Sequence, residues 1–177
     1  MKNRIYAIAL FCLVGLVSAC DSDDDNTSNA YETSKQVWLN FKAENSNTYQ
    51  YTATESSWAG YGWETTLTVE NGIVTERHFK YTQTPLDHNL SEEELEWTET
   101  DDQIGSHENG AQPLTLDEIY TLAEENWLTE RENATIYFET ENNGMISICG
   151  YVESNCADDC FIGIKIKSIE AYYTNAE

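Results

Sequence analysis

The chain has 177 residues, a formal net charge of −23 at pH 7 and 40% hydrophobic residues. So acidic a balance argues against nucleic acids and anionic lipid headgroups as partners, because like charges repel. Five Trp, eleven Tyr and five Phe place the chain among folded proteins and not among intrinsically disordered ones. We therefore expect one folded domain and no nucleic-acid partner.

The N-terminus has the pattern of a cleaved export signal. Lys2 and Arg4 precede an apolar stretch at residues 5–17. This stretch is too short to span a bilayer, for which about 20 residues are needed. The sequence therefore predicts a signal peptide at residues 1–19.

Residues 17–20 have the sequence VSAC, which resembles the cleavage site of bacterial lipoproteins. Small side chains before the cut suit the peptidase, and the thiol of Cys20 would then form a thioether with a diacylglyceryl group. Each buried methylene contributes about 0.8 kcal/mol, so the three acyl chains usual for this class would hold the protein firmly on a membrane. The alternative is an ordinary secretory cleavage site at which Cys20 is incidental.

Residues 20–33 are predicted to form a lipidated acidic tether, because they are polar and lack periodicity. The run Ser22–Asp25 resembles the acidic signal that sends some bacterial lipoproteins to the cell surface. Asp21, directly after the cysteine, instead resembles a signal for retention at the inner membrane. We favour the outer membrane or the cell surface and keep the periplasmic face of the inner membrane as the alternative.

Residues 34–177 are predicted to form one domain. Helical spacing of apolar residues predicts helices at 34–43 and 116–128. Alternating apolar residues predict strands at 49–53, 63–69, 73–81, 134–141, 145–152 and 161–172. The pair Asn71-Gly72 predicts a hairpin, and Thr115 with Glu118 predicts a capping box. Residues 85–113 are charged and without pattern, which predicts a long acidic loop.

The order αβββαβββ predicts an α+β fold: an antiparallel sheet with one main helix and a short N-terminal helix packed on one face. Within residues 36–172 the chain resembles a family of small bacterial lipoproteins classed only as a domain of unknown function. The segments that carry this resemblance are the Asn47/Tyr49/Tyr51 strand, the hairpin TVENGIV at Thr68–Val74, the helix capped by Thr115 and the Ile136/Tyr137 strand. The resemblance implies no known activity.

Three cysteines remain once Cys12 leaves with the signal peptide and Cys20 is modified: Cys149, Cys156 and Cys160. Outside the cytoplasm two of them should form a disulfide. We expect Cys149 to pair with Cys160, because the predicted hairpin brings its strand ends together; the two pairings that involve Cys156 stay open. Closing a loop of about ten residues would contribute roughly 2 to 3 kcal/mol.

A thiol-active or other envelope enzyme that uses Cys149, Cys156 or Cys160 is the alternative function. A nucleophilic cysteine needs a base, yet the three histidines are scattered along the sequence: His78, His88 and His107. Asp158 and Asp159 would raise the pKa of a neighbouring thiol and make it a poorer nucleophile. The sequence also lacks a standard zinc spacing, a phosphate-binding loop and a serine-hydrolase motif. We therefore predict no catalytic residue, no metal site and no cofactor.

The segment SWAGYGW, residues 57–63, places two tryptophans and a tyrosine in a connection between strands. Aromatic side chains on such a loop hold sugars or partner proteins, so Trp58, Tyr61 and Trp63 are our binding candidates. The alternative is that Trp58 and Trp63 fold back and cap the sheet. The sequence therefore favours a lipid-anchored, non-catalytic binding module whose partner is an envelope protein, a glycan or a small ligand.

Overall fold

The computed structural model describes residues 22–58, 60–84, 90–157 and 160–173. The predicted signal peptide, the lipidation site Cys20 and Asp21 lie outside the described residues, as do His88, Asp158 and Asp159. The chain divides into two units, residues 1–30 and 31–177, and the packing below concerns the second unit. No helix in the described part of the chain is both long and apolar enough to cross a bilayer.

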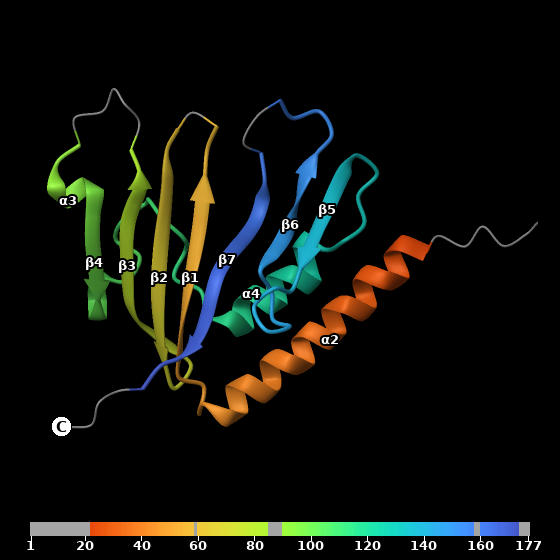
Figure 1. Ribbon diagram of the computed structural model, residues 1–177, viewed down its shortest axis with the longest axis horizontal. Helices are drawn as coiled ribbons and strands as arrows, with labels where there is room; N and C mark the ends of the chain where they lie inside the picture. The colour runs from red at the N-terminus through yellow and green to blue at the C-terminus, as the bar shows by residue number, and fades with distance from the viewer. Residues whose placement is uncertain (1–21, 59, 85–89, 158–159, 174–177) are drawn as a thin grey trace, which may run out of the picture. The chain divides into compact units, whose positions relative to one another are not determined.

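An antiparallel sheet of seven strands, in the order β4-β3-β2-β1-β7-β6-β5, is the main feature of the described residues (Figure 1). The strands are β1 (Tyr49–Ser56), β2 (Gly62–Glu70), β3 (Ile73–Gln83), β4 (Glu96–Thr100), β5 (Ala134–Glu139), β6 (Ile148–Glu153) and β7 (Ile162–Ala171). The helices are α2 (Ser22–Glu44), α3 (Glu92–Leu95), a 3-10 turn (Asp101–Gln103), α4 (Leu116–Leu122) and a π-helical turn (Ala123–Trp127). The predicted α+β class with an antiparallel sheet is confirmed.

The strand order contains one strand more than predicted, because β4 lies inside the segment that we expected to be an acidic loop. Trp97 and Glu99 of β4 are buried, while the residues between and beside them are exposed. This is the alternation of a strand, but one of its two inward positions holds a carboxylate. Because a charged residue stands at one of the buried positions, the apolar alternation typical of a strand is absent from the sequence. The prediction of a loop is wrong for residues 92–103.

Helix α2 begins at Ser22, so residues 22–33, in which the sequence shows no helical periodicity, are helical. Asp, Asn, Ser and Thr are weak helix formers in the interior of a helix, which is why the segment lacked a helical signal. Within the second unit, α2 turns Tyr31, Ser34 and Trp38 toward the domain, and all three are at least 96% buried. Their spacing of three and four residues places them on one face of the helix.

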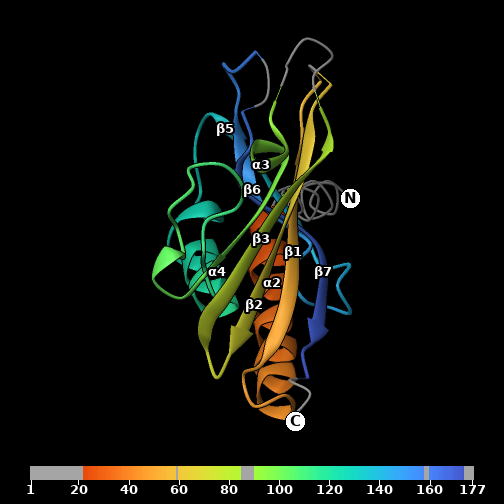
Figure 2. The same ribbon diagram turned by 90° about the vertical axis from the view of Figure 1, so that its left-hand side faces the viewer.

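The core lies on the sheet face that contacts the helices (Figure 2). The Trp38 ring packs edge-on against Tyr49 of β1, with ring centroids 5.0 Å apart, and stacks on Tyr120 of α4 at 6.3 Å. The Tyr49 hydroxyl accepts a hydrogen bond from the Leu116 backbone N–H, and the Tyr51 hydroxyl donates to the Leu114 carbonyl. These tyrosines therefore contribute apolar area to the core and also satisfy backbone groups at the start of α4.

Candidate binding cleft

The sheet opens where β7 changes its partner strand. The first part of β7, Ile162–Lys165, pairs with β6, and the second part, Ile166–Ala171, pairs with β1. β1 pairs with β2 as far as Ser56, but its pairing with β7 ends at Ala53. Within the described residues, the end of β1 and the start of β7 thus lie next to each other without pairing (Figure 1). Residues of both strands line a cleft there.

On the helix side of the sheet the cleft forms a cavity of about 440 Å³. Two tryptophans line it, Trp63 of β2 and Trp127 of the π-helical turn, together with Ile162 and Ile164 of β7. A cavity of this size is within the range of small-ligand and side-chain pockets. Because both tryptophans are half-buried, they offer apolar surface to an occupant while they remain fixed by their neighbours.

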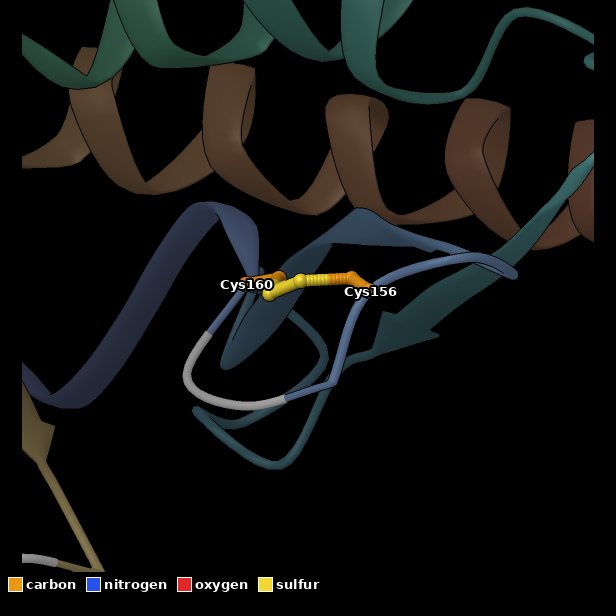
Figure 3. Close-up of a disulfide and its surroundings, with 2 residues drawn as sticks. All are labelled: Cys156 and Cys160. Carbon is orange, nitrogen blue, oxygen red and sulfur yellow. A yellow bond between two sulfur atoms is a disulfide. The ribbon is translucent and has the colours of Figure 1, made fainter.

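On the outer side of the sheet the cleft forms a second cavity, of about 480 Å³. Its walls include Tyr61 from the β1–β2 connection, Phe161, and the Cys156–Cys160 disulfide of the β6–β7 connection (Figure 3). The Phe161 ring lies 6.3 Å from Tyr137, which alternates in β5 with a core residue and therefore belongs to the outer face.

One ion pair spans the cleft and lines both cavities. Lys165 Nζ lies 2.5 Å from Glu55 Oε1, and the same oxygen accepts a hydrogen bond of 3.2 Å from the Ser56 backbone N–H. About a third of each charged side chain is exposed. Exposed pairs of this kind contribute about 0 to 1 kcal/mol, so an incoming ligand can separate the two residues at little cost.

Two glycines allow β7 to approach β6 closely. Gly150 and Gly163 face each other across these strands. A side chain at Gly163 would collide with the Cys149 carbonyl oxygen and with the Gly150 backbone, and the φ of Gly163 is +152°. Only glycine fits here, and the sequence offered no sign of the contact.

The predicted binding residues are divided between three places. Trp63 lines the helix-side cavity, Tyr61 lines the outer cavity, and Trp58 is 75% exposed in the β1–β2 connection. Trp58 therefore does not cap the sheet, whereas Trp63 packs near Phe79, with ring centroids 6.1 Å apart. Trp127 was not among the predicted binding residues, because its place in the predicted helix at 116–128 indicated a core residue.

The loop before α4 forms one wall of the helix-side cavity, through residues 110–112 and Leu114. Arg77 of β3, which is 2% exposed, fixes this loop. Its Nε donates to the Ala111 carbonyl at 2.7 Å, and its two terminal nitrogens donate to the carbonyls of His107 and Asn109. This part of the segment predicted to be an acidic loop is therefore held in place by the buried guanidinium of Arg77.

Glu99, a residue of β4, neutralises the charge of Arg77. Its Oε2 lies 3.0 Å from an Arg77 nitrogen, and its carboxylate accepts hydrogen bonds from the backbone N–H groups of Gly105 and His107. The Ser106 hydroxyl and the His107 ring also contact it. Although burial raises the pKa of Glu99, these hydrogen bonds and Arg77 outweigh it and lower the pKa to about 2.

The lowered pKa of Glu99 predicts a pH dependence of stability. Its contribution is complete above pH 4.5, the pKa of a free glutamate, and is lost as the pH falls from there toward 2. Urea midpoints of the wild type and of Glu99→Gln should therefore differ most above pH 4.5 and converge toward pH 2. Glu96→Gln, which changes an exposed carboxylate beside His78, is the control. A difference that stays constant across this pH range would refute the assignment.

The cysteines correct one prediction. Cys156 and Cys160 form the disulfide and Cys149 is a buried thiol, so the expected Cys149–Cys160 pair is wrong and one of the open alternatives holds. The reason is strand alternation: Cys149 faces the core opposite Ile164, whereas the other two cysteines lie in the connection after β6.

None of the described residues supplies the elements of a thiol active site. Burial raises the pKa of the Cys149 thiol to about 12, so it is neutral at ordinary pH. The imidazoles of His78 and His107 contact Glu96 and Glu99. In the described part of the chain, no three His, Cys, Asp or Glu side chains gather as metal ligands would.

Comparisons of the chain with protein-family models, with curated proteins and with solved structures each gave no match. The likeness to a family of lipoproteins therefore stays a prediction, and the function of the cleft has to be inferred from its own residues.

Proposed function

We propose that this chain is a lipid-anchored, non-catalytic binding protein of the bacterial cell envelope, and that it holds its ligand in the cleft between β1 and β7. One observation carries the proposal: two cavities, one on each face of the sheet, meet at the same break in strand pairing. Two tryptophans and a lysine–glutamate pair line this cleft, which is the mixture of apolar and polar groups that binding sites use.

Three features support the envelope location. The basic residues, apolar stretch and VSAC segment at the N-terminus fit a lipoprotein signal that ends at Cys20. The Cys156–Cys160 disulfide fits an oxidising compartment. The acidic run after Cys20 favours the outer membrane or the cell surface, with the inner membrane as the alternative.

A binding role is favoured over an enzymatic one because the free thiol of the described residues is not activated. Cys149 is buried and lines neither cavity, and its pKa, raised to about 12 by burial, keeps it neutral at ordinary pH. Trp63 and Trp127 provide the large, rigid contact area on which recognition commonly depends.

The anchor is tested by replacing Cys20 with serine in the native host. We expect the Cys20→Ser variant to leave the membrane fraction, since it cannot accept the diacylglyceryl group. Cys149→Ser serves as the control for loss of a cysteine elsewhere and should remain membrane-bound. If the Cys20→Ser protein stays in the membrane fraction, the anchor is refuted.

The cleft is tested by placing a photo-cross-linking amino acid at one of two exposed isoleucines. Ile162 lines the helix-side cavity, and Ile73 lies at the start of β3, beside the Asn71-Gly72 turn. Irradiation of intact cells should give a defined adduct from position 162 and none from position 73. Equal yields at the two positions, or no adduct from position 162, would contradict the proposed site.

A further inference from the structure

The facing edges of the cleft are strand edges. Ile166 donates its N–H to the Ser147 carbonyl on the β6 side, and backbone groups of successive residues alternate between the two edges of a strand. The backbone groups of Gly163 and the backbone N–H of Lys165 therefore point toward β1. On the other side of the cleft, the Ser57 N–H donates to the Tyr61 carbonyl of the hairpin, so Ser56 turns its backbone groups toward β7.

At the β1 edge of the cleft, the Glu55 carboxylate accepts the hydrogen bond that a carbonyl of a neighbouring strand would otherwise accept. The Ser56 N–H, which points into the cleft, donates to Glu55 Oε1 instead of to a β7 carbonyl. The same carboxylate holds the Lys165 ammonium on the opposite edge. The Glu55 side chain thus accepts from a backbone donor of the β1 edge and pairs with a side chain of β7, and it is exposed enough to move aside.

The two cavities match the side-chain pattern of an extended chain. Successive side chains of a strand point to opposite faces of its sheet. A strand lying between β1 and β7 would place one side chain against Trp63 and Trp127 and the next against Tyr61 and Phe161. A sugar or a compact small molecule would need only one of these cavities, so their presence on both faces favours a polypeptide.

We propose that the ligand is an extended segment of a partner polypeptide, which adds as a short strand between β1 and β7 and displaces the Glu55 carboxylate from the cleft. This inference rests on the proposed function and names its ligand class. Main-chain hydrogen bonds to the two edges fix the segment, and the two cavities select alternate side chains. Because the chain carries a net charge of −23, basic residues flanking the segment strengthen its attraction to the protein.

The experiment uses the oxidised mature chain and a positional-scanning library of acetylated, amidated hexapeptides. Binding is followed by tryptophan fluorescence and by calorimetry. We expect pools with aromatic or β-branched residues at alternate positions to bind. The best hexapeptide is then made again with N-methyl groups on its two central residues, which should weaken its affinity at least about tenfold because two main-chain donors are lost.

Two variants separate strand addition from general binding. Glu55→Ala removes the group that occupies the cleft and should tighten binding of the hexapeptide about threefold or more. Glu64→Ala is the matched control, since this glutamate also pairs with a lysine of β7, Lys167, but does not line either cavity. It should leave the affinity unchanged.

Two results would overturn strand addition. In the first, the N-methylated hexapeptide binds as tightly as its parent. In the second, no pool binds below about 1 mM. If either result is obtained and the photo-cross-linker at position 162 still forms an adduct, the cleft is a binding site for another class of ligand, such as a glycan. Loss of that adduct would instead refute the proposed function itself.

Discussion

Replacing Arg77 with alanine is expected to lower the free energy of unfolding by about 3 to 5 kcal/mol, because the change leaves the Glu99 carboxylate buried and without its partner. Both side chains are at most 2% exposed. The same change also removes the donors that hold the carbonyls of His107, Asn109 and Ala111. The loop that walls the cleft should therefore exchange its amide protons faster.

Urea denaturation measures the stability, and hydrogen exchange of residues 105–111 measures the loop. Arg131→Ala removes an arginine that stacks on Tyr151 outside this network and should cost less than about 1 kcal/mol. The double variant Arg77→Leu/Glu99→Leu should recover only the part of the loss that comes from the unpaired Glu99 charge, because the loop backbone still lacks its hydrogen-bond partners. A loss below about 1 kcal/mol for Arg77→Ala would contradict the role assigned to the pair.

Replacing Trp38 with alanine should also cost about 3 to 5 kcal/mol, since the substitution leaves a large cavity between α2, β1 and α4. Trp38 is 1% exposed and contacts Tyr49, Tyr120 and Phe41 through its ring. Its Nε1–H donates to Asp117 Oδ1 at 3.0 Å. Loss of the ring therefore loosens α2 from the domain as well as reducing total stability.

The Trp38→Phe variant divides this effect into two parts. Phenylalanine keeps most of the ring contacts but lacks the donor to Asp117, so we expect a loss closer to about 1 kcal/mol. Thermal and urea unfolding of the three proteins measure the difference. Equal losses for the alanine and phenylalanine variants would mean that the hydrogen bond, and not the packing, carries the contribution of this residue.

The local elements of the fold could be predicted from the sequence. Asn71 and Gly72 both adopt positive φ, 52° and 82°, as the predicted hairpin requires. Thr115 and Glu118 form the predicted capping box at the start of α4. In each case the signal lies within a few consecutive residues and depends on their backbone conformation or on hydrogen bonds among them.

Elements whose signal depends on distant residues could not be predicted. The buried Glu99 of β4 pairs with Arg77, 22 positions away, and unless that partner is known a glutamate at an inward position argues against a strand. The helix predicted at 116–128 ends at Leu122 and continues as a π-helical turn, which no residue pattern in this segment predicts.

The candidate site was predicted only in its local part. Trp63 and Tyr61 stood out because they lie in one unusual run of aromatic and glycine residues. The cleft that contains them depends on where the pairing between β1 and β7 ends, and Ala53 and Ile166 are far apart in the sequence. Neighbouring residues do not determine such a register, so neither the cleft nor the place of Trp127 could be foreseen.

The exchange of partners along β7 has a consequence for how the chain folds. β1 to β4 and β5 with β6 are two blocks of strands that follow one another in sequence, and only the last strand pairs with both. Contacts such as Gln50 with Glu170 join the ends of the domain, and contacts this distant form slowly. The sheet can close only once β7 is present, so its seven strands cannot all pair on the nascent chain before that strand has been synthesised.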